Sequence, residues 1–142
     1  MPQTLALLFE AFPQTPHPMK LHRELNIGRN IITAIGERHI DINGQRYENS
    51  LLVLPQQILE NWAQGGFDAL SLTAFRPIIE LKAEILLLGT GLRQRFPAPA
   101  LLRELMSAHI GVEVMDTSAA CRTFNILVAE GRNVAAALLI EP

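Results

Sequence analysis

Residues 84 to 96 read E-I-L-L-L-G-T-G-L-R-Q-R-F, an apolar run that ends in two closely spaced glycines. Ile85 to Leu88 are four apolar residues in succession, a pattern typical of a strand that is buried on both faces of a sheet. Gly89 and Gly91 then predict a sharp turn at the carboxyl end of this strand. The stretch therefore predicts a central strand with a candidate site at its end.

The composition indicates one soluble domain that is large enough to bury a core. The chain has 142 residues, of which 49% are hydrophobic and 18% charged, and a chain of this length buries roughly two-thirds of its unfolded surface. Its formal charge of -2 comes from 12 basic and 14 acidic residues, which favours neither nucleic acid nor a membrane surface as a partner. Cys121 is the only cysteine, so no internal disulfide can form and a reducing compartment is favoured.

The first 18 residues are expected to form a flexible extension. A short apolar patch, Leu5 to Phe9, lacks a leading basic region and is followed by Glu10 and Pro13, which is a poor match to a signal peptide. The patch is also far shorter than the roughly 20 apolar residues of a membrane-spanning helix. We therefore expect a single domain over residues 19–142 and no membrane insertion. The alternative is that residues 1–18 form a short amphipathic docking segment.

The first third of the domain carries the β-branched residues, alternation and turn residues of strands. Asn43-Gly44 tolerates positive φ at both central positions of a type I′ turn and so predicts a hairpin. Strands are expected over residues 30–35, 39–42, 45–48 and 50–54, in the order of an antiparallel meander. Residues 56–70 fit a mixed connection. A short helix is expected over residues 72–81, where Pro77 is acceptable only if it falls within the first turn.

The second half of the chain alternates strands and helices. Strands are expected over residues 85–88, 112–115 and 134–140, and helices over residues 100–109 and 119–130. The first of these helices has one apolar stripe, formed by Leu101, Leu102, Leu105 and Met106. Gly111 is expected to end that helix, and Gly131 is expected to end the second one in the left-handed conformation.

Two consecutive strand–helix–strand units imply a parallel sheet with right-handed crossovers. The predicted fold class is therefore mixed α/β, with an N-terminal antiparallel meander followed by β-α-β-α-β units. The loops after parallel strands emerge at the same edge of a sheet. Residues 89–91 and residues 116–118, whose side chains offer N-cap oxygens to the following helix, are thus expected to lie close together.

This edge is the candidate ligand pocket, because crevices beyond the carboxyl ends of parallel strands are preferred binding sites. Glycine N–H groups, a helix N-terminus and guanidinium groups can together hold a phosphate or carboxylate, and Arg93 and Arg95 make the glycine turn locally positive. A small anionic ligand is thus a candidate partner. Its predicted binding residues are Gly89, Thr90, Gly91, Arg93, Asp116, Thr117, Arg122 and Asn125. Solvated arginines beside a structural turn are the alternative.

Other motifs give weaker signals. Gly89-Thr90-Gly91 begins a dinucleotide-binding fingerprint, but Gln94 stands where the third glycine belongs and Pro97 delays the next helix. A tight turn that needs glycine is the simpler interpretation. Cys121 stands near the start of a predicted helix, where a thiol can be activated, but no histidine is placed by sequence to assist it. A small buried hydrophobe is the commoner role of such a cysteine.

The sequence predicts no metal site and no cofactor. The four histidines, at positions 17, 22, 39 and 109, have no ligand spacing to one another or to Cys121. The chain contains no G-x-S-x-G, H-E-x-x-H, G-K-[ST] or paired-cysteine motif. No residue can therefore be assigned a catalytic role from the sequence.

Four segments carry a resemblance to a known family. They are I-L-L-L-G-T-G-L-R-Q-R-F-P at 85–97, G-V-E-V-M-D-T at 111–117, A-A-C-R-T-F-N-I-L at 119–127 and E-G-R-N-V-A-A-A-L at 130–138. In order and spacing the chain resembles the Mth938-like family, once listed as a domain of unknown function, from about Met19 to its end. It is similar to the branch of mitochondrial respiratory complex I assembly factor 3. The resemblance implies a compact α/β domain with a mixed sheet, and it carries over no catalytic residue.

Two functions follow as hypotheses. The first is a non-enzymatic binding or assembly module with protein partners, related to respiratory complex assembly, which the resemblance implies. The second is an enzyme or sensor that binds a small anionic ligand at the Gly89 to Gly91 loop. The chain is expected to be bacterial and cytoplasmic, because it lacks the Arg-rich, acidic-poor leader of a mitochondrial precursor. The sequence leaves its oligomeric state open.

Overall fold

The computed structural model describes residues 28–141, so the predicted extension over residues 1–18 and the predicted domain start at Met19 lie outside the described residues. The strands are β1 (Ile32–Ile35), β2 (Ile40–Ile42), β3 (Gln45–Tyr47), β4 (Leu51–Leu54), β5 (Gln57–Leu59), β6 (Ile85–Gly89), β7 (Gly111–Met115) and β8 (Val134–Leu138). The helices are η2 (Phe67–Ala69), η3 (Leu72–Phe75), α2 (Arg76–Glu80), α3 (Pro99–Ser107) and α4 (Thr117–Ala129). None of the helices in this part of the chain combines the length and apolarity that a membrane crossing needs.

The strands form two sheets. A three-stranded sheet has the order β1-β2-β3, and a five-stranded sheet has the order β5-β4-β8-β6-β7. In the larger sheet β6 pairs in parallel with both β7 and β8, whereas β4 pairs antiparallel with β5 and β8. The predicted β-α-β-α-β units and the mixed α/β class are therefore confirmed.

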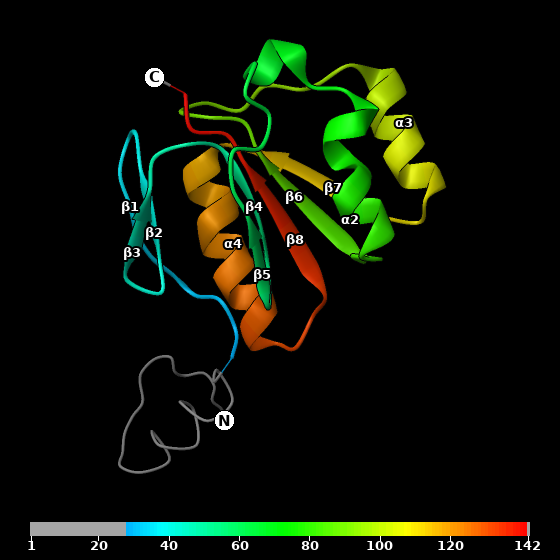
Figure 1. The fold of residues 1–142 in the computed structure, drawn as a ribbon. Helices are drawn as coiled ribbons and strands as arrows, with labels where there is room; N and C mark the ends of the chain where they lie inside the picture. Colours follow the sequence, from blue (N-terminus) through cyan, green and yellow to red (C-terminus); the bar gives the residue numbers. More distant parts are fainter. Residues whose placement is uncertain (1–27, 142) are drawn as a thin grey trace.

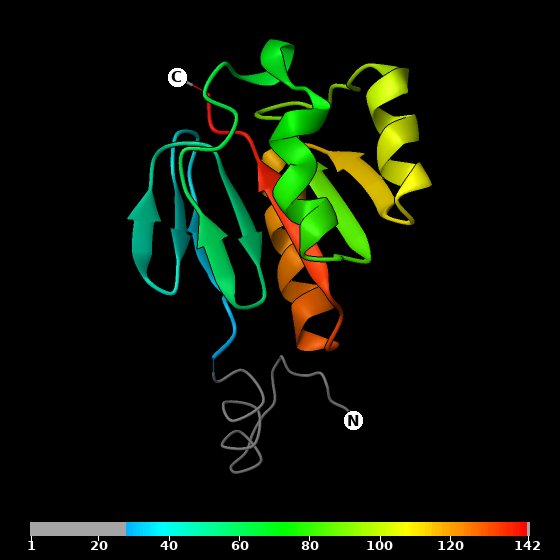
Figure 2. The same cartoon turned by 45° about the vertical axis from the view of Figure 1, so that its right-hand side comes forward.

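The five-stranded sheet is covered on both faces (Figures 1 and 2). Helices α2 and α3 pack on one face, and α4 and the three-stranded sheet pack on the other. The sheet has a hydrophobic core on each face, and alternate residues of its central strands point into one or the other. Leu86 and Leu88 of β6 face α2 and α3, and Leu87 faces α4. The continuous apolar run at 85–88 is the sequence signature of this double burial.

The hairpin that Asn43-Gly44 predicts is present. Asn43 and Gly44 both have positive φ, 54° and 83°, as a type I′ turn requires, and Ile42 pairs directly with Gln45. β1, β2 and β3 therefore form an antiparallel meander, with the side chains of Ile40 and Ile42 buried against α4.

The predicted meander is divided between two sheets. β4 does not pair with β3 but with β5 and β8, and all four of its residues are buried. A strand that is apolar on both faces has to be covered on both, and a position inside the larger sheet provides this cover. Strand β5 was not predicted, because Gln57–Leu59 is only three residues long and lies in the stretch expected to be a mixed connection.

The end of α3 differs from the prediction. The helix stops at Ser107, and His109 takes the left-handed conformation with φ 65°, whereas Gly111 is already the first residue of β7. The predicted apolar stripe is also shorter than expected, because Met106 is 61% exposed while Leu101 and Leu105 are buried. At the end of α4, Gly131 does take the left-handed conformation, as predicted.

Candidate functional site

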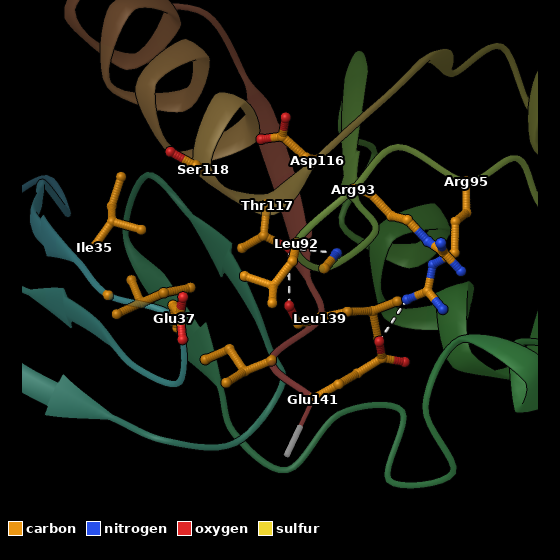
Figure 3. A pocket seen from close by; sticks show the side chains of 14 residues that line it. Ile35, Glu37, Leu92, Arg93, Arg95, Asp116, Thr117, Ser118, Leu139 and Glu141 are labelled. Atoms are coloured by element: carbon orange, nitrogen blue, oxygen red, sulfur yellow. Dashed lines mark hydrogen bonds and ion pairs between the residues drawn. The ribbon is translucent and has the colours of Figure 1, made fainter.

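A pocket of about 400 Å³ lies at the edge where β6, β7 and β8 end. Its walls come from four segments: the turn between β1 and β2 with the strand ends beside it, the loop after β6, the start of α4 and the residues after β8. In Figure 3 the first wall carries Ile35 and Glu37, the opposite wall carries Arg93 and Arg95, and Leu92 lies between them. The lining residues are Ile35, Gly36, Glu37, Ile40, Gly91, Leu92, Arg93, Arg95, Asp116, Thr117, Ser118, Leu139, Ile140 and Glu141.

Thr117 joins three of these segments. Its buried Oγ1 accepts a hydrogen bond from Gly91 N at 2.8 Å and donates one to Leu139 O at 2.8 Å. Asp116 caps α4, since its Oδ1 accepts from Ala119 N at 2.8 Å. The start of α4 therefore fixes the loop after β6 and the end of β8 in one arrangement.

Thr90 shapes the loop after β6. Its hydroxyl is completely buried, donates to Arg93 O at 2.7 Å and accepts from Arg95 N at 2.9 Å. Gln94, also in this loop, donates from Nε2 to Val114 O of β7 at 2.8 Å. These hydrogen bonds hold the loop in a defined shape between β6 and Pro97.

Arg95 and Glu141 form an ion pair beside the pocket (Figure 3), with 2.5 Å between Arg95 Nη2 and Glu141 Oε1. The same guanidinium donates to Thr90 O from Nη2 at 2.7 Å and from Nε at 3.1 Å. It also lies 4.4 Å from the centroid of the Phe67 ring, and Phe67 N donates to Glu141 Oε2 at 3.2 Å. Arg95 therefore ties the loop after β6 to the C-terminal segment and to η2.

The two glycines of the motif have structural roles. A Cβ on Gly89 would lie 2.9 Å from Thr117 Cα and 3.1 Å from the Ala120 side chain, so Gly89 lets α4 approach β6 closely. Gly91 has φ 97°, a conformation that strongly favours glycine. The helix after this loop begins only at Pro99. The geometry supports the tight-turn interpretation over the dinucleotide fingerprint.

The pocket brings together four of the eight predicted ligand residues: Gly91, Arg93, Asp116 and Thr117. Gly89 and Thr90 are buried and do not line it. Arg122 and Asn125 do not line it: Arg122 Nη1 donates to Ser118 Oγ at 2.6 Å on the exposed face of α4. Asn125 accepts from Ile32 N at 2.9 Å and donates to Ile32 O at 2.8 Å.

Most of the groups that were expected to hold an anion are already engaged. Gly91 N donates to Thr117, Thr90 N donates to Met115 O at 2.9 Å, and Arg95 is paired with Glu141. The carboxylates of Glu37, Asp116 and Glu141 line the same pocket. Arg93 is the lining guanidinium with no ion pair among the described residues. Carboxylates outnumber guanidinium groups in the lining, so the pocket as a whole does not favour a small anion enclosed within it.

Cys121 is a buried core residue and not an exposed nucleophile. Its side chain has no exposed surface, and burial raises the pKa of its thiol to about 12. Thiolates are the reactive form of cysteine, so this thiol stays protonated near neutral pH. The interpretation as a small buried hydrophobe is supported.

Residues 28–141 contain no group of three or more His, Cys, Asp or Glu side chains placed to hold a metal ion. His17 and His22 lie outside this range.

Sequence reasoning missed two walls of the pocket. Leu139, Ile140 and Glu141 follow β8, and a signal for them existed: β8 was predicted as a parallel strand, so the residues after it had to emerge at the same edge. Ile35 ends β1 and Glu37 follows it, and nothing in the local sequence indicates that the small sheet turns back to this edge.

A family model described as "Protein of unknown function (DUF498/DUF598)" matches residues 32–139. The chain belongs to this family. A structure from Bordetella pertussis described as an Mth938-like domain is 28% identical, with a TM-score of 0.71, and the match covers 92% of each chain. A crystal structure from Bordetella parapertussis is 36% identical, with a TM-score of 0.74, over 80% of this chain and 98% of that chain.

The chain is also similar to proteins named for an assembly role. The zebrafish (Danio rerio) protein "NADH dehydrogenase [ubiquinone] 1 alpha subcomplex assembly factor 3" is 36% identical over 124 residues, which are 86% of this chain and 70% of that protein. The Mth938-like chain described here is thus related to complex I assembly factor 3, as the resemblance in the sequence implied.

Proposed function

We propose that this Mth938-like protein is a non-enzymatic binding module that takes part in the assembly of a respiratory NADH dehydrogenase. The name of the zebrafish relative supports the assembly role. The partners would be subunits of that complex before they join the finished enzyme.

The observation that carries a binding role is the engagement of the polar groups at the carboxyl edge. Thr117 Oγ1, Asp116 Oδ1 and the Arg95 guanidinium each bond to neighbouring segments of the protein itself. Groups that catalyse a reaction must be able to reach a substrate. Here they hold three loops in place, which suits a rigid scaffold for a partner.

A second candidate is a sensor or enzyme for a small anionic ligand. Arg93 favours it, because this arginine lines the pocket and has no ion pair within residues 28–141. The three lining carboxylates weigh against it, since like charges repel an anion at short range. An NMR titration with phosphate and carboxylates, followed at Gly91 and Thr117, separates the two: saturable shifts at these amides favour the second candidate.

Deletion of the gene tests the assembly role in a source organism whose membranes contain the complex. The expected result is a loss of assembled NADH dehydrogenase on native gels, while its subunits are still synthesised, with recovery when the wild-type gene is returned. Normal amounts of assembled enzyme in the deletion strain would contradict the proposal.

We further propose that the protein acts in the cytoplasm of a bacterium. The single cysteine is consistent with a reducing compartment. Immunodetection in cytoplasmic, periplasmic and membrane fractions tests this location, and recovery from the periplasm would contradict it.

A further inference from the structure

The loop after β6 exposes two large apolar side chains within five residues. Leu92 is 77% exposed and Phe96 is 66% exposed, more than any other large hydrophobic side chain among the described residues. Single exposed apolar residues are normal on a protein surface. Here two exposed apolar side chains stand on one loop, and Leu92 also lines the pocket at the carboxyl edge.

This exposure is built into a fixed loop. Thr90 bonds to the loop at Arg93 and Arg95, and Gln94 bonds to β7. The ion pair between Arg95 and Glu141 anchors the loop on its other side. A surface that is already ordered loses little conformational freedom when it binds a partner. A few well-ordered side chains can then supply most of the binding energy.

The charge on the loop indicates what kind of partner fits it. Arg95 is neutralised by Glu141, but Arg93, which stands between Leu92 and Phe96, is exposed and has no acidic partner within residues 28–141. Along the loop, an arginine without an ion pair in the described part of the chain thus stands between two exposed apolar residues. The complementary surface is an apolar segment that carries a carboxylate, since arginine pairs with carboxylates through charge-assisted hydrogen bonds.

We infer that residues 92–96 are the docking loop of this protein, and that its occupant is an apolar, acidic segment of the partner subunit whose carboxylate pairs with Arg93. This inference rests on the proposed assembly function. Leu92 and Phe96 supply the buried anchors of the contact, and Arg93 supplies its specificity.

Site-specific photo-cross-linking in the source organism tests the docking loop. The photoreactive amino acid p-benzoylphenylalanine replaces Phe96 in the full chain, and it replaces Met106 on α3 or Ile126 on α4 in two matched controls. These control side chains are 61% and 59% exposed, so they have similar access to a partner. Thermal unfolding confirms that each variant is folded.

The expected result is a cross-link from position 96, and not from positions 106 or 126, to a subunit of NADH dehydrogenase at an apolar segment with an acidic residue. Arg93→Glu should lower the yield of this product by about tenfold, and Arg93→Lys should largely retain it. Reversal of the charge on the cross-linked acidic residue should restore the yield with Arg93→Glu.

The other outcomes separate the two proposals. Cross-links to a subunit only from position 106 or 126 would overturn the docking loop and leave the assembly function intact. A cross-link from position 96 to a second copy of this chain would overturn it in favour of self-association. No cross-link to any subunit from position 96 would overturn the docking loop, whereas the amount of assembled enzyme in the deletion strain decides separately on the assembly function.

Discussion

Arg95 Nη2 lies 2.5 Å from Glu141 Oε1, and this ion pair joins the loop after β6 to the segment after β8. The pair is partly buried, with side-chain exposures of 25% and 33%. The same arginine donates to Thr90 O and stacks on the Phe67 ring. The shape of the carboxyl edge therefore depends on one guanidinium that contacts three segments.

Arg95→Met should destabilise the protein more than Glu141→Gln does. The methionine loses the ion pair, the hydrogen bonds to Thr90 O and the stacking on Phe67, whereas the glutamine loses mainly charge. We expect a loss of about 2 kcal/mol for Arg95→Met, and a coupling energy of about 1 kcal/mol between the two positions. Urea unfolding of both single variants and the double variant measures these values. A coupling near zero would mean that the ion pair does not fix the edge.

Thr117→Val should lower the free energy of unfolding by about 2–4 kcal/mol, because it leaves the buried Gly91 N–H and Leu139 C=O without their partner. Valine has nearly the shape of threonine, so packing is retained. Thr117→Ser keeps the hydroxyl and is the matched control. If both variants unfold alike, the hydroxyl bridge is not what stabilises the edge.

Gly89→Ala should destabilise the protein by about 1–3 kcal/mol through overpacking, since the new Cβ would lie 2.9 Å from Thr117 Cα. Gly111→Ala is the control in the neighbouring strand β7, because there the nearest atom is Glu84 O at an ordinary 3.6 Å. Thermal unfolding compares the two variants. An unfolding temperature for Gly89→Ala as high as that of Gly111→Ala would contradict the close approach of α4 to β6.

Asn125→Ala should weaken the attachment of β1 to α4 without impairing partner binding. The side-chain amide bonds to both the N–H and the C=O of Ile32, as a paired strand would. We expect a loss of about 1–3 kcal/mol and faster hydrogen exchange at Ile32. Asn125→Asp keeps the acceptor for Ile32 N but sets a carboxylate oxygen against Ile32 O, so it should destabilise the protein at least as much as alanine does. If a folded Asn125→Ala protein no longer bound its partner, Asn125 would have a role in binding and not only in stability.

The contribution of Cys121 to the free energy of unfolding should fall as the pH rises above about 9. The thiol pKa is raised from 9.0 to about 12 by burial, so between these values the unfolded chain loses a proton that the folded chain keeps. The unfolded state is then favoured by up to about 1.4 kcal/mol per pH unit, and the contribution of Cys121 is fully present below pH 9. Cys121→Ala should remove this part of the slope. Urea unfolding at pH 8 to 11 measures it, and equal slopes for the two proteins would contradict a buried, protonated thiol.

The sequence predicts the elements of this fold well where the signal is local. The run at 85–88, the Asn43-Gly44 turn and the Asp116 cap each depend on neighbours along the chain, and the structure confirms all three. The alternation of strands and helices also predicts the parallel pairing of β6 with β7 and β8. The position of the pocket follows from that pairing.

What the sequence could not predict depends on contacts between distant residues. The pairing of β4 with β8 joins Leu51 to Leu138 across the chain, and no local pattern encodes this partner. The role of Asn125 is of the same kind, because its partner Ile32 lies 93 residues away. Arg95 shows the limit for the site: its sequence neighbourhood is positive, yet Glu141 neutralises it in the fold.

Rescue of NADH dehydrogenase assembly by variants of the docking loop tests most directly whether residues 92–96 bind the partner. Leu92→Ser/Phe96→Ser and Met106→Ser/Ile126→Ser each remove two exposed apolar side chains, and neither pair lies in the buried core. Each variant is expressed at wild-type level in the deletion strain, and assembled enzyme is measured on native gels. If residues 92–96 are the docking loop, the loop variant fails to restore the complex while the helix variant restores it. Full rescue by a folded Leu92→Ser/Phe96→Ser protein would contradict this role of the loop.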